Sequence, residues 1–160
     1  MGVQNSGKWA QTGWANLRGA GKFVYIECNG DKYVQERFPA PSNGNSERYT
    51  VNQETSGIWY YFYSGSLLVE CSDTFWIKNK GTGTAAQYCG EIFNEEDDMP
   101  GTAAQPCTFR SLGYKINYGT LTSVTLQYLT STDSTKWGFS QTSSGFDMWD
   151  KCPDGDGNGI

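Results

Sequence analysis

Residues 22–33 read KFVYIECNGDKY, and this stretch decides the fold class. Val24, Ile26 and Cys28 alternate with aromatic and charged residues, which is the period of two expected when successive side chains point to opposite faces of a β-strand. The Asn29-Gly30 turn that follows, with a second run beginning at Tyr33, is typical of a β-hairpin. We therefore predict antiparallel strands on both sides of this turn.

The same period of two recurs along most of the chain, and no stretch shows the 3.6-residue stripe of a helix. Further strands are expected at about residues 48–53, 58–63, 66–71, 75–78, 114–118, 123–129 and 136–141. The longest irregular stretch is 79–106. About eight or nine short strands joined by turns predict an all-β fold with negligible helix: an antiparallel β-sandwich, a jelly roll or a closed barrel.

The 160 residues suit one domain, which we place at residues 1–149. The polar, Asp- and Gly-rich segment 150–160 has no apolar pattern. It is expected to be a tail or the start of a following calcium-binding repeat.

The composition excludes several classes of function. The chain has no histidine, which removes Ser-His-Asp and Cys-His nucleophiles and His-ligated metals. Its net charge of −5 and scattered basic residues argue against nucleic acid as a partner. Membrane insertion is not expected, because no apolar run approaches the roughly 18 residues of a transmembrane helix.

Five cysteines without a CxxC pair favour disulfides, and hence an extracellular, secreted or cell-surface location, over a zinc ribbon or a redox site. Cys28 and Cys71 each end an apolar alternating run, so both should point into the core and form a bridge. The segments GTAAQYC (83–89) and GTAAQPC (101–107) match at six of seven positions and are interpreted as a duplicated loop or turn, whose two copies a Cys89–Cys107 bridge would join. The alternative is a low-complexity expansion in a surface loop. Cys152 is then left unpaired or pairs between chains.

Two segments carry oxygen ligands at close spacing, which is the chemistry that Ca²⁺ prefers. These residues are the acidic run Glu95, Glu96, Asp97 and Asp98, and the tail residues Asp154, Asp156 and Asn158. Calcium is the one cofactor that the sequence suggests. The alternative is that the first segment is a solvated acidic loop and the second a polar tail.

The segment Ile58–Tyr63 reads IWYYFY and is the most distinctive part of the chain. Strand alternation places Trp59, Tyr61 and Tyr63 on one face, where an exposed ladder of rings would stack on sugar rings. Trp76 is a further ligand-binding candidate, and Trp137 and Trp149 are secondary ones. The alternative is a central strand with both faces buried.

Gly7-Lys8-Trp9 resembles the Gly-x-Trp motif of lipocalins and avidins, and the same pattern recurs at Gly57-Ile58-Trp59. The resemblance covers three residues. It implies an eight-stranded barrel that binds a small ligand.

We expect an extracellular binding or cell-adhesion module, lectin-like, that binds carbohydrate through the aromatic ladder. The alternatives are a structural subunit of an extracellular matrix or filament and a lipocalin-like small-ligand-binding barrel. The expected partners are a glycan or an extracellular protein, with self-association in the filament case. No enzyme is expected, although paired carboxylates among Glu27, Glu36, Glu70 and Glu91 leave a glycosidase open.

Overall fold

The computed structural model describes residues 2–5, 7–17, 19–30, 33–53, 58–71, 85–90, 100–114, 120–124, 126, 131 and 134–151. All regular elements in these residues are β-strands, which confirms the all-β prediction. No helix in the described ranges is long and apolar enough to cross a membrane. By their contacts the residues form two compact units, Met1–Cys89 and Gly90–Ile160. One domain over residues 1–149 stays a prediction.

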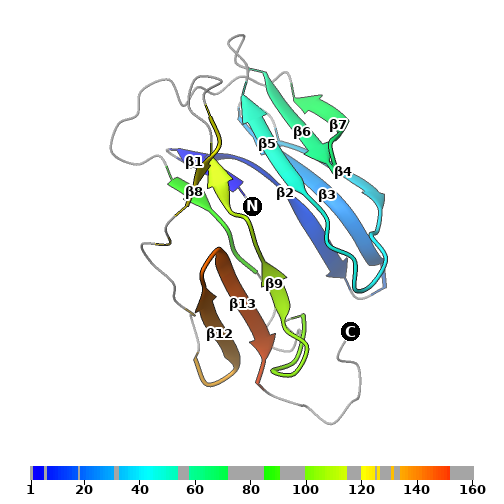
Figure 1. Ribbon diagram of the computed structural model, residues 1–160. Coiled ribbons are helices and arrows are strands. Elements are labelled where there is room, and N and C mark those ends of the chain that lie inside the picture. The colour runs from blue at the N-terminus through cyan, green and yellow to red at the C-terminus, as the bar shows by residue number, and fades with distance from the viewer. Residues whose placement is uncertain are drawn as a thin grey trace. The chain divides into compact units, whose positions relative to one another are not determined.

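The first unit contains two antiparallel sheets (Figure 1). The strands of the five-stranded sheet, in the order β4-β3-β2-β1-β8, are β1 (Gly2–Asn5), β2 (Lys8–Leu17), β3 (Gly21–Asn29), β4 (Tyr33–Pro39) and β8 (Ala85–Gln87). The strands of the three-stranded sheet, in the order β5-β6-β7, are β5 (Tyr49–Gln53), β6 (Trp59–Tyr63) and β7 (Ser66–Cys71).

The predicted hairpin around Asn29-Gly30 is confirmed as the β3–β4 pair. Pairing runs from Asn29 opposite Tyr33 to Phe23 opposite Pro39. A second confirmed hairpin joins β6 to β7 through Ser64 and Gly65, whose φ angles are 46° and 86°. Positive φ at both central residues is the conformation of a type I′ two-residue hairpin turn, and glycine adopts it without steric cost.

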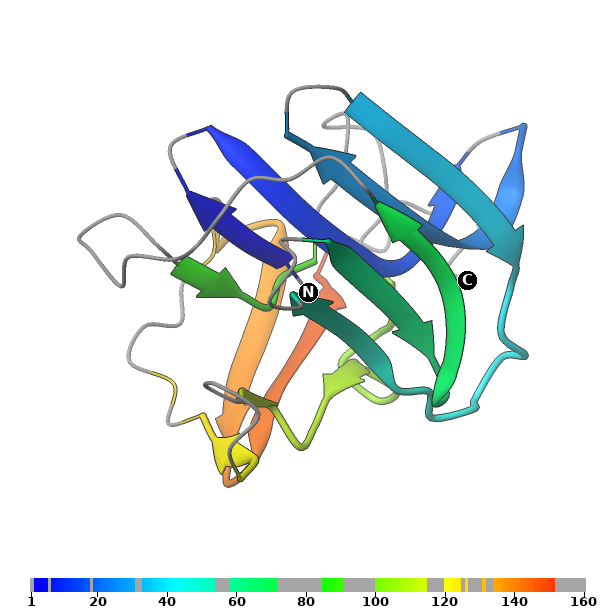
Figure 2. The same cartoon turned by 90° about the horizontal axis from the view of Figure 1, so that it is seen from above.

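The core of the first unit lies between its two sheets. It consists of side chains that are at most 4% exposed, namely Ala10, Ile26, Cys28, Trp59, Tyr61 and Cys71. A disulfide between Cys28 on β3 and Cys71 on β7 joins the sheets, as predicted. The sheets form two layers, with β5 beside β2 (Figure 2).

The second unit is built on a smaller sheet in the order β12-β13-β9. Its strands are β9 (Cys107–Phe109), β12 (Trp137–Thr142) and β13 (Gly145–Asp150), with a separate pair β10 (Gly113–Tyr114) and β11 (Thr122–Ser123). Phe146, Met148 and Leu112 are buried, and the ring of Phe109 stacks on Phe146 at 4.5 Å between centroids.

Each described sheet has two different edge strands, so none of them closes into a barrel. The closed-barrel alternative, and with it the barrel implied by the Gly-x-Trp resemblance, is therefore wrong for the described residues. Strand β12 agrees with the predicted 136–141, and β10 and β11 overlap the starts of the predicted strands 114–118 and 123–129. The predicted strand 75–78 lies outside the described residues.

The two GTAAQ segments do not share one conformation. Ala85–Gln87 of the first forms β8 and pairs with β1. Thr102–Gln105 of the second forms a tight turn, in which the N–H of each end residue donates to the carbonyl of the other at 3.1 Å. The two copies therefore do not form the same turn, because sheet pairing decides the conformation of the first copy. The duplication itself stays a prediction.

Candidate functional site

The exposed aromatic ladder predicted on β6 is not found. Trp59 is 2% exposed and Tyr61 is fully buried, and both face the core. Tyr63 is half-buried at the end of the strand. The opposite face of β6 carries Tyr60 and Phe62, which are also half-buried. The assignment of the two faces was therefore wrong for Trp59 and Tyr61.

A β-bulge in β7 explains why Trp59, and not its neighbour Tyr60, lies on the core side of β6. From Tyr63 opposite Ser66, a regular hairpin would place Cys71 opposite Ile58. The register shifts by one residue between Tyr61 and Phe62, which places Trp59 opposite Cys71. Because a shift of one residue moves a strand's side chains to the other face, Cys71 enters the core beside Trp59.

The remaining predicted site residues fall into two groups. Trp76, Glu95, Glu96, Asp97, Asp98, Asp154, Asp156 and Asn158 lie outside the described residues, so ligand binding by Trp76 and calcium binding stay predictions. In the described ranges, no group of three or more acidic or cysteine side chains is placed to hold a metal ion.

The predicted Cys89–Cys107 bridge is not formed in the described part of the chain, where Cys107 is a thiol. Cys89 ends the first compact unit and Cys107 begins β9 of the second, so the repeat does not place them in one unit. Burial, and then the charge of Asp147, raise the pKa of the Cys107 thiol. The thiol is therefore protonated and weakly reactive at neutral pH.

A different surface gathers polar and aromatic side chains. It is the face of the five-stranded sheet that points away from the core, and we call it the Glu27 face. Strand register places three successive rows of residues on it. The rows are Trp9, Asn29 and Tyr33; then Gln11, Glu27 and Gln35; then Gly13, Tyr25 and Arg37.

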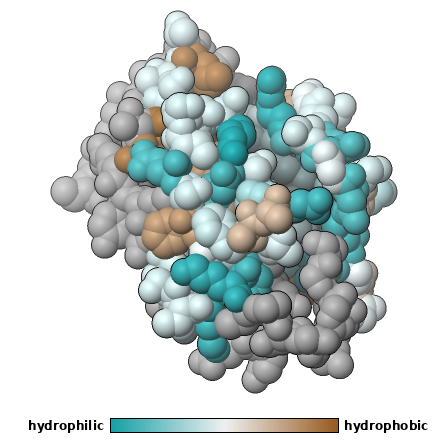
Figure 3. All heavy atoms as spheres, turned by 60° about the horizontal axis from the view of Figure 1, so that its bottom comes forward, coloured by the Kyte–Doolittle hydropathy of each residue, from teal (hydrophilic) through white to brown (hydrophobic). Residues whose placement is uncertain are grey.

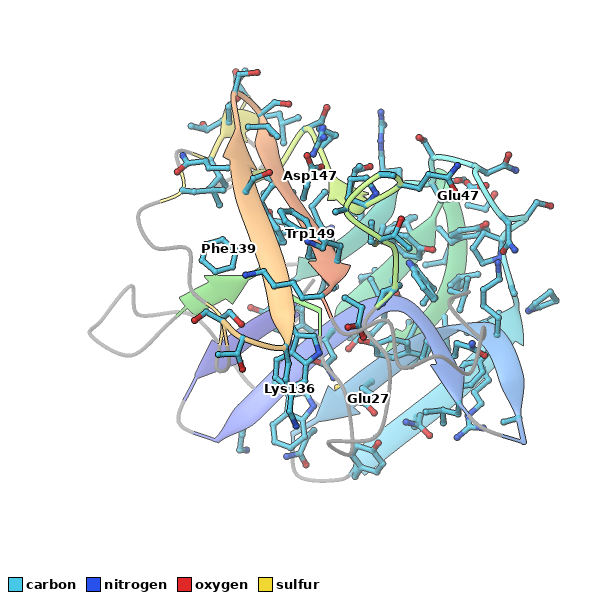
Figure 4. The ribbon with its side chains drawn as sticks, turned by 90° about the horizontal axis from the view of Figure 1, so that it is seen from below. Glu27, Glu47, Lys136, Phe139, Asp147 and Trp149 are labelled. Carbon is cyan, nitrogen blue, oxygen red and sulfur yellow. A yellow bond between two sulfur atoms is a disulfide. The ribbon has the colours of Figure 1, made fainter. Side chains whose placement is uncertain are left out.

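The carboxylate of Glu27 is the centre of this face (Figure 4). Its Oε2 accepts a hydrogen bond from Nε2 of Gln11 at 2.5 Å, and its Oε1 accepts one from Nε2 of Gln35 at 2.6 Å. The hydroxyl of Tyr33 donates a third bond to Oε1 at 2.8 Å. Three donors from both neighbouring strands therefore hold one half-buried carboxylate in a fixed orientation.

Aromatic side chains lie on both sides of this polar row. Tyr33 is 56% exposed, and the ring of Tyr25 covers Gly13, where a Cβ atom would lie 3.4 Å from Cε1 of that ring. Trp9 is half-buried, and its indole N–H has no acceptor among the described residues. A buried donor without a partner costs about 1–3 kcal/mol.

The electrostatics keep Tyr33 a hydrogen-bond donor. Partial burial raises its pKa, the hydrogen bond to Glu27 and the charge of that carboxylate raise it further, and Arg37 opposes the shift. The phenol is therefore protonated at neutral pH. The guanidinium of Arg37 lies 4.4 Å from the centroid of the Phe23 ring, which fixes the cation beside the third row.

The Glu27 face offers the contacts that a hydroxylated ligand needs. Side chains in successive rows lie about 6.5 Å apart, so the three rows span about 13 Å. Amides, a carboxylate and a phenol provide both donors and acceptors, and the rings provide apolar contact. On the side shown in Figure 3, hydrophobic residues occur in small separate groups among hydrophilic ones, as expected for contact with water and polar ligands.

The sequence suggests only one role for Glu27, that of a carboxylate in a glycosidase pair. Glu27 and Glu36 are on opposite faces of their sheet, so they do not form a catalytic pair, and Glu91 lies outside the described residues. The signal that could have found the site is the pattern Trp9-x-Gln11 on one side and Tyr33-x-Gln35 on the other, flanking Tyr25-x-Glu27 in the strand between them.

Comparisons of the chain with protein-family models, with curated proteins and with solved structures give no match.

Proposed function

We propose that the chain is an extracellular carbohydrate-binding module, and that its first unit is a two-sheet sandwich whose Glu27 face binds an extended glycan. The observation that carries the proposal is the row formed by Gln11, Glu27 and Gln35, in which two amides fix a carboxylate between aromatic rings. Sugar hydroxyls act as donor and acceptor at once, so a row that offers both matches them. The Cys28–Cys71 disulfide supports an oxidising, extracellular compartment.

The length of the face supports an oligosaccharide over a single sugar. Trp9 and Tyr33 lie in the first row and Tyr25 in the third, so rings are available about 13 Å apart along the strands. By analogy with base stacking, each ring that contacts a sugar contributes about 1–3 kcal/mol. Several weak contacts along an extended chain then add to a useful affinity.

Isothermal titration calorimetry on the full chain tests this function. The probes are soluble neutral glucans, mannans, xylans and galactans, with polygalacturonate as an acidic comparison. We expect at least one neutral polysaccharide to bind, and Gln35→Ala and Tyr33→Ala each to lower its affinity at least about fivefold. Glu36→Ala is the matched control, because Glu36 is exposed on the same strand but on the opposite face.

Two results would overturn the proposal. One is that none of the neutral polysaccharides binds. The other is that Glu36→Ala lowers affinity as much as Gln35→Ala does, because the loss would then not depend on the face.

A further inference from the structure

The second unit has a polar sheet face of its own, which we call the Trp149 face. On it, Trp149 lies opposite Gly138, and Asp147 lies opposite Ser140 and Thr108 in the next row. The core residues Phe146 and Met148 alternate with these on β13 and point the other way. The Trp149 face is therefore the side of this sheet that does not form the buried core.

The indole ring of Trp149 lies directly over Gly138. A Cβ atom at Gly138 would be 2.2 Å from Cε2 and 2.3 Å from Nε1 of the ring, so only glycine leaves room for it. One face of the indole is thus covered by the backbone of β12. Trp149 is half-buried, so the rest of the ring stays accessible in a fixed orientation.

Arg110 and Asp147 form a hydrogen-bonded polar pair, in which Asp147 lies two residues before Trp149 on the same face of β13. The guanidinium donates to the carbonyl oxygens of Phe146 at 3.0 Å and Phe109 at 3.2 Å, and to Oδ1 of Asp147 at 2.5 Å. A guanidinium has five N–H donors. Two donors of Arg110 and Oδ2 of Asp147 therefore have no partner among the described residues, and the Arg110 side chain is 40% exposed.

The chemistry of the pair selects the ligand. Two adjacent sugar hydroxyls present an acceptor to a guanidinium and a donor to a carboxylate, while the C–H face of the ring stacks on an indole. Arg110 is already neutralised by Asp147, and the chain carries a net charge of −5, so an acidic sugar gains little here. Asp147 and Trp149 are two residues apart on one strand face, about 6.5 Å, a spacing suited to one sugar ring.

We infer that the Trp149 face is a second, independent carbohydrate site, which takes one neutral sugar with two adjacent hydroxyls. This inference rests on the proposed function for the class of ligand, but it uses other residues in the other unit. A chain with two sites could hold two points of one polysaccharide or link two polysaccharides.

The test uses the full chain and the neutral polysaccharides named above, with two readouts. The double variant Tyr33→Ala/Gln35→Ala removes contacts at the Glu27 face, so the binding that it retains is assigned to the Trp149 face. The indole N–H signal of Trp149 in a ¹H–¹⁵N spectrum, identified by its loss in Trp149→Phe, reports that site directly.

We expect the double variant to retain binding, the Trp149 signal to shift on titration, and Trp149→Ala to lower the retained affinity at least about fivefold. Asp147→Asn and Arg110→Gln are smaller changes, and they test the same loss of retained affinity if Trp149→Ala fails to fold. Phe139→Ala is the matched control, because Phe139 is 37% exposed on the other face of β12.

The experiment distinguishes a failure of the second site from a failure of the proposed function. If the double variant binds nothing while the wild type binds, the second site is overturned and the proposed function stands. An unmoved Trp149 signal at saturation also overturns it. If the double variant binds as well as the wild type and Trp149→Ala abolishes binding, the second site stands and the role of the Glu27 face falls.

Discussion

The hydroxyl of Tyr61 on β6 donates a 2.9 Å hydrogen bond to the backbone carbonyl of Glu27 on β3. Tyr61 is fully buried, so this bond crosses the core and joins the two sheets of the first unit. The side chain of Glu27 points to the opposite side of its strand and accepts the three bonds of the Glu27 face. One residue thus fixes the packing of the sheets and the position of the candidate site.

This bond predicts a loss of stability at alkaline pH. Burial, and then the charge of Glu27, raise the pKa of Tyr61 well above its ordinary value of 10.0. The unfolded chain therefore loses the phenol proton at lower pH than the folded chain does. The stabilisation from Tyr61 is fully present below about pH 10 and falls as the pH rises above it.

Tyr61→Phe lacks both the bond and the titration. At neutral pH we expect the variant to be less stable by about 1 kcal/mol. The difference should shrink above about pH 10, because only the wild type loses stability through this group. Urea unfolding of both proteins between about pH 8 and pH 11, with thiols blocked, measures it. A difference independent of pH contradicts the prediction.

The Cys28–Cys71 disulfide should contribute a large part of the stability of the first unit. It closes a loop with a sequence separation of 43, for which loop-closure entropy gives about 4 kcal/mol. We expect Cys28→Ala/Cys71→Ala to lose stability of that order in urea unfolding. Cys107→Ala is the control, since Cys107 is outside any described disulfide, and an equal loss in both variants would refute the assignment.

Some of this structure follows from the sequence because strong local signals agree. The alternation before Asn29-Gly30 gave the β3–β4 hairpin, and the inward position of Cys28 and Cys71 gave their bridge. Strand β2 was missed because its two fully buried residues, Ala10 and Thr12, are a small residue and a polar one. Thr12 is fully buried there, and its hydroxyl donates to the carbonyl of Tyr25 at 2.8 Å, so a polar residue occupies a core position without cost to its hydrogen bonding.

The face of β6 could not be read from its residues, because aromatic side chains lie on both faces. Which face of β6 enters the core depends on the bulge in β7, and no local sequence pattern predicts that bulge. The same bulge explains why Leu67 is 53% exposed although it belongs to the alternating run that ends at Cys71. The Glu27 face was missed for another reason: its residues come from three strands, and only the sheet register brings them together.

Gly145 should be intolerant of any side chain. It is buried, and a Cβ atom there would lie 1.8 Å from the carbonyl oxygen of Phe109. Because the obstacle is backbone, β9 must separate from β13 to make room. We expect Gly145→Ala to destabilise the second unit by about 1–3 kcal/mol or more. Amide exchange on β9 and β13 measures it, and the exposed Ser144→Ala is the control; equal exchange in both variants contradicts the prediction.

Trp59 and Tyr60 test which face of β6 is the core. Trp59 is 2% exposed between the two sheets, whereas its neighbour Tyr60 is half-buried on the opposite face. Trp59→Ala removes a buried ring and leaves a cavity, so we expect it to cost about 3–5 kcal/mol in urea unfolding. Tyr60→Ala is the matched control and should cost clearly less, because part of its ring already contacts water. If Tyr60→Ala is the more destabilising of the two while Trp59→Ala leaves stability unchanged and weakens glycan binding, the sheet has the opposite face inward and the aromatic ladder is exposed after all.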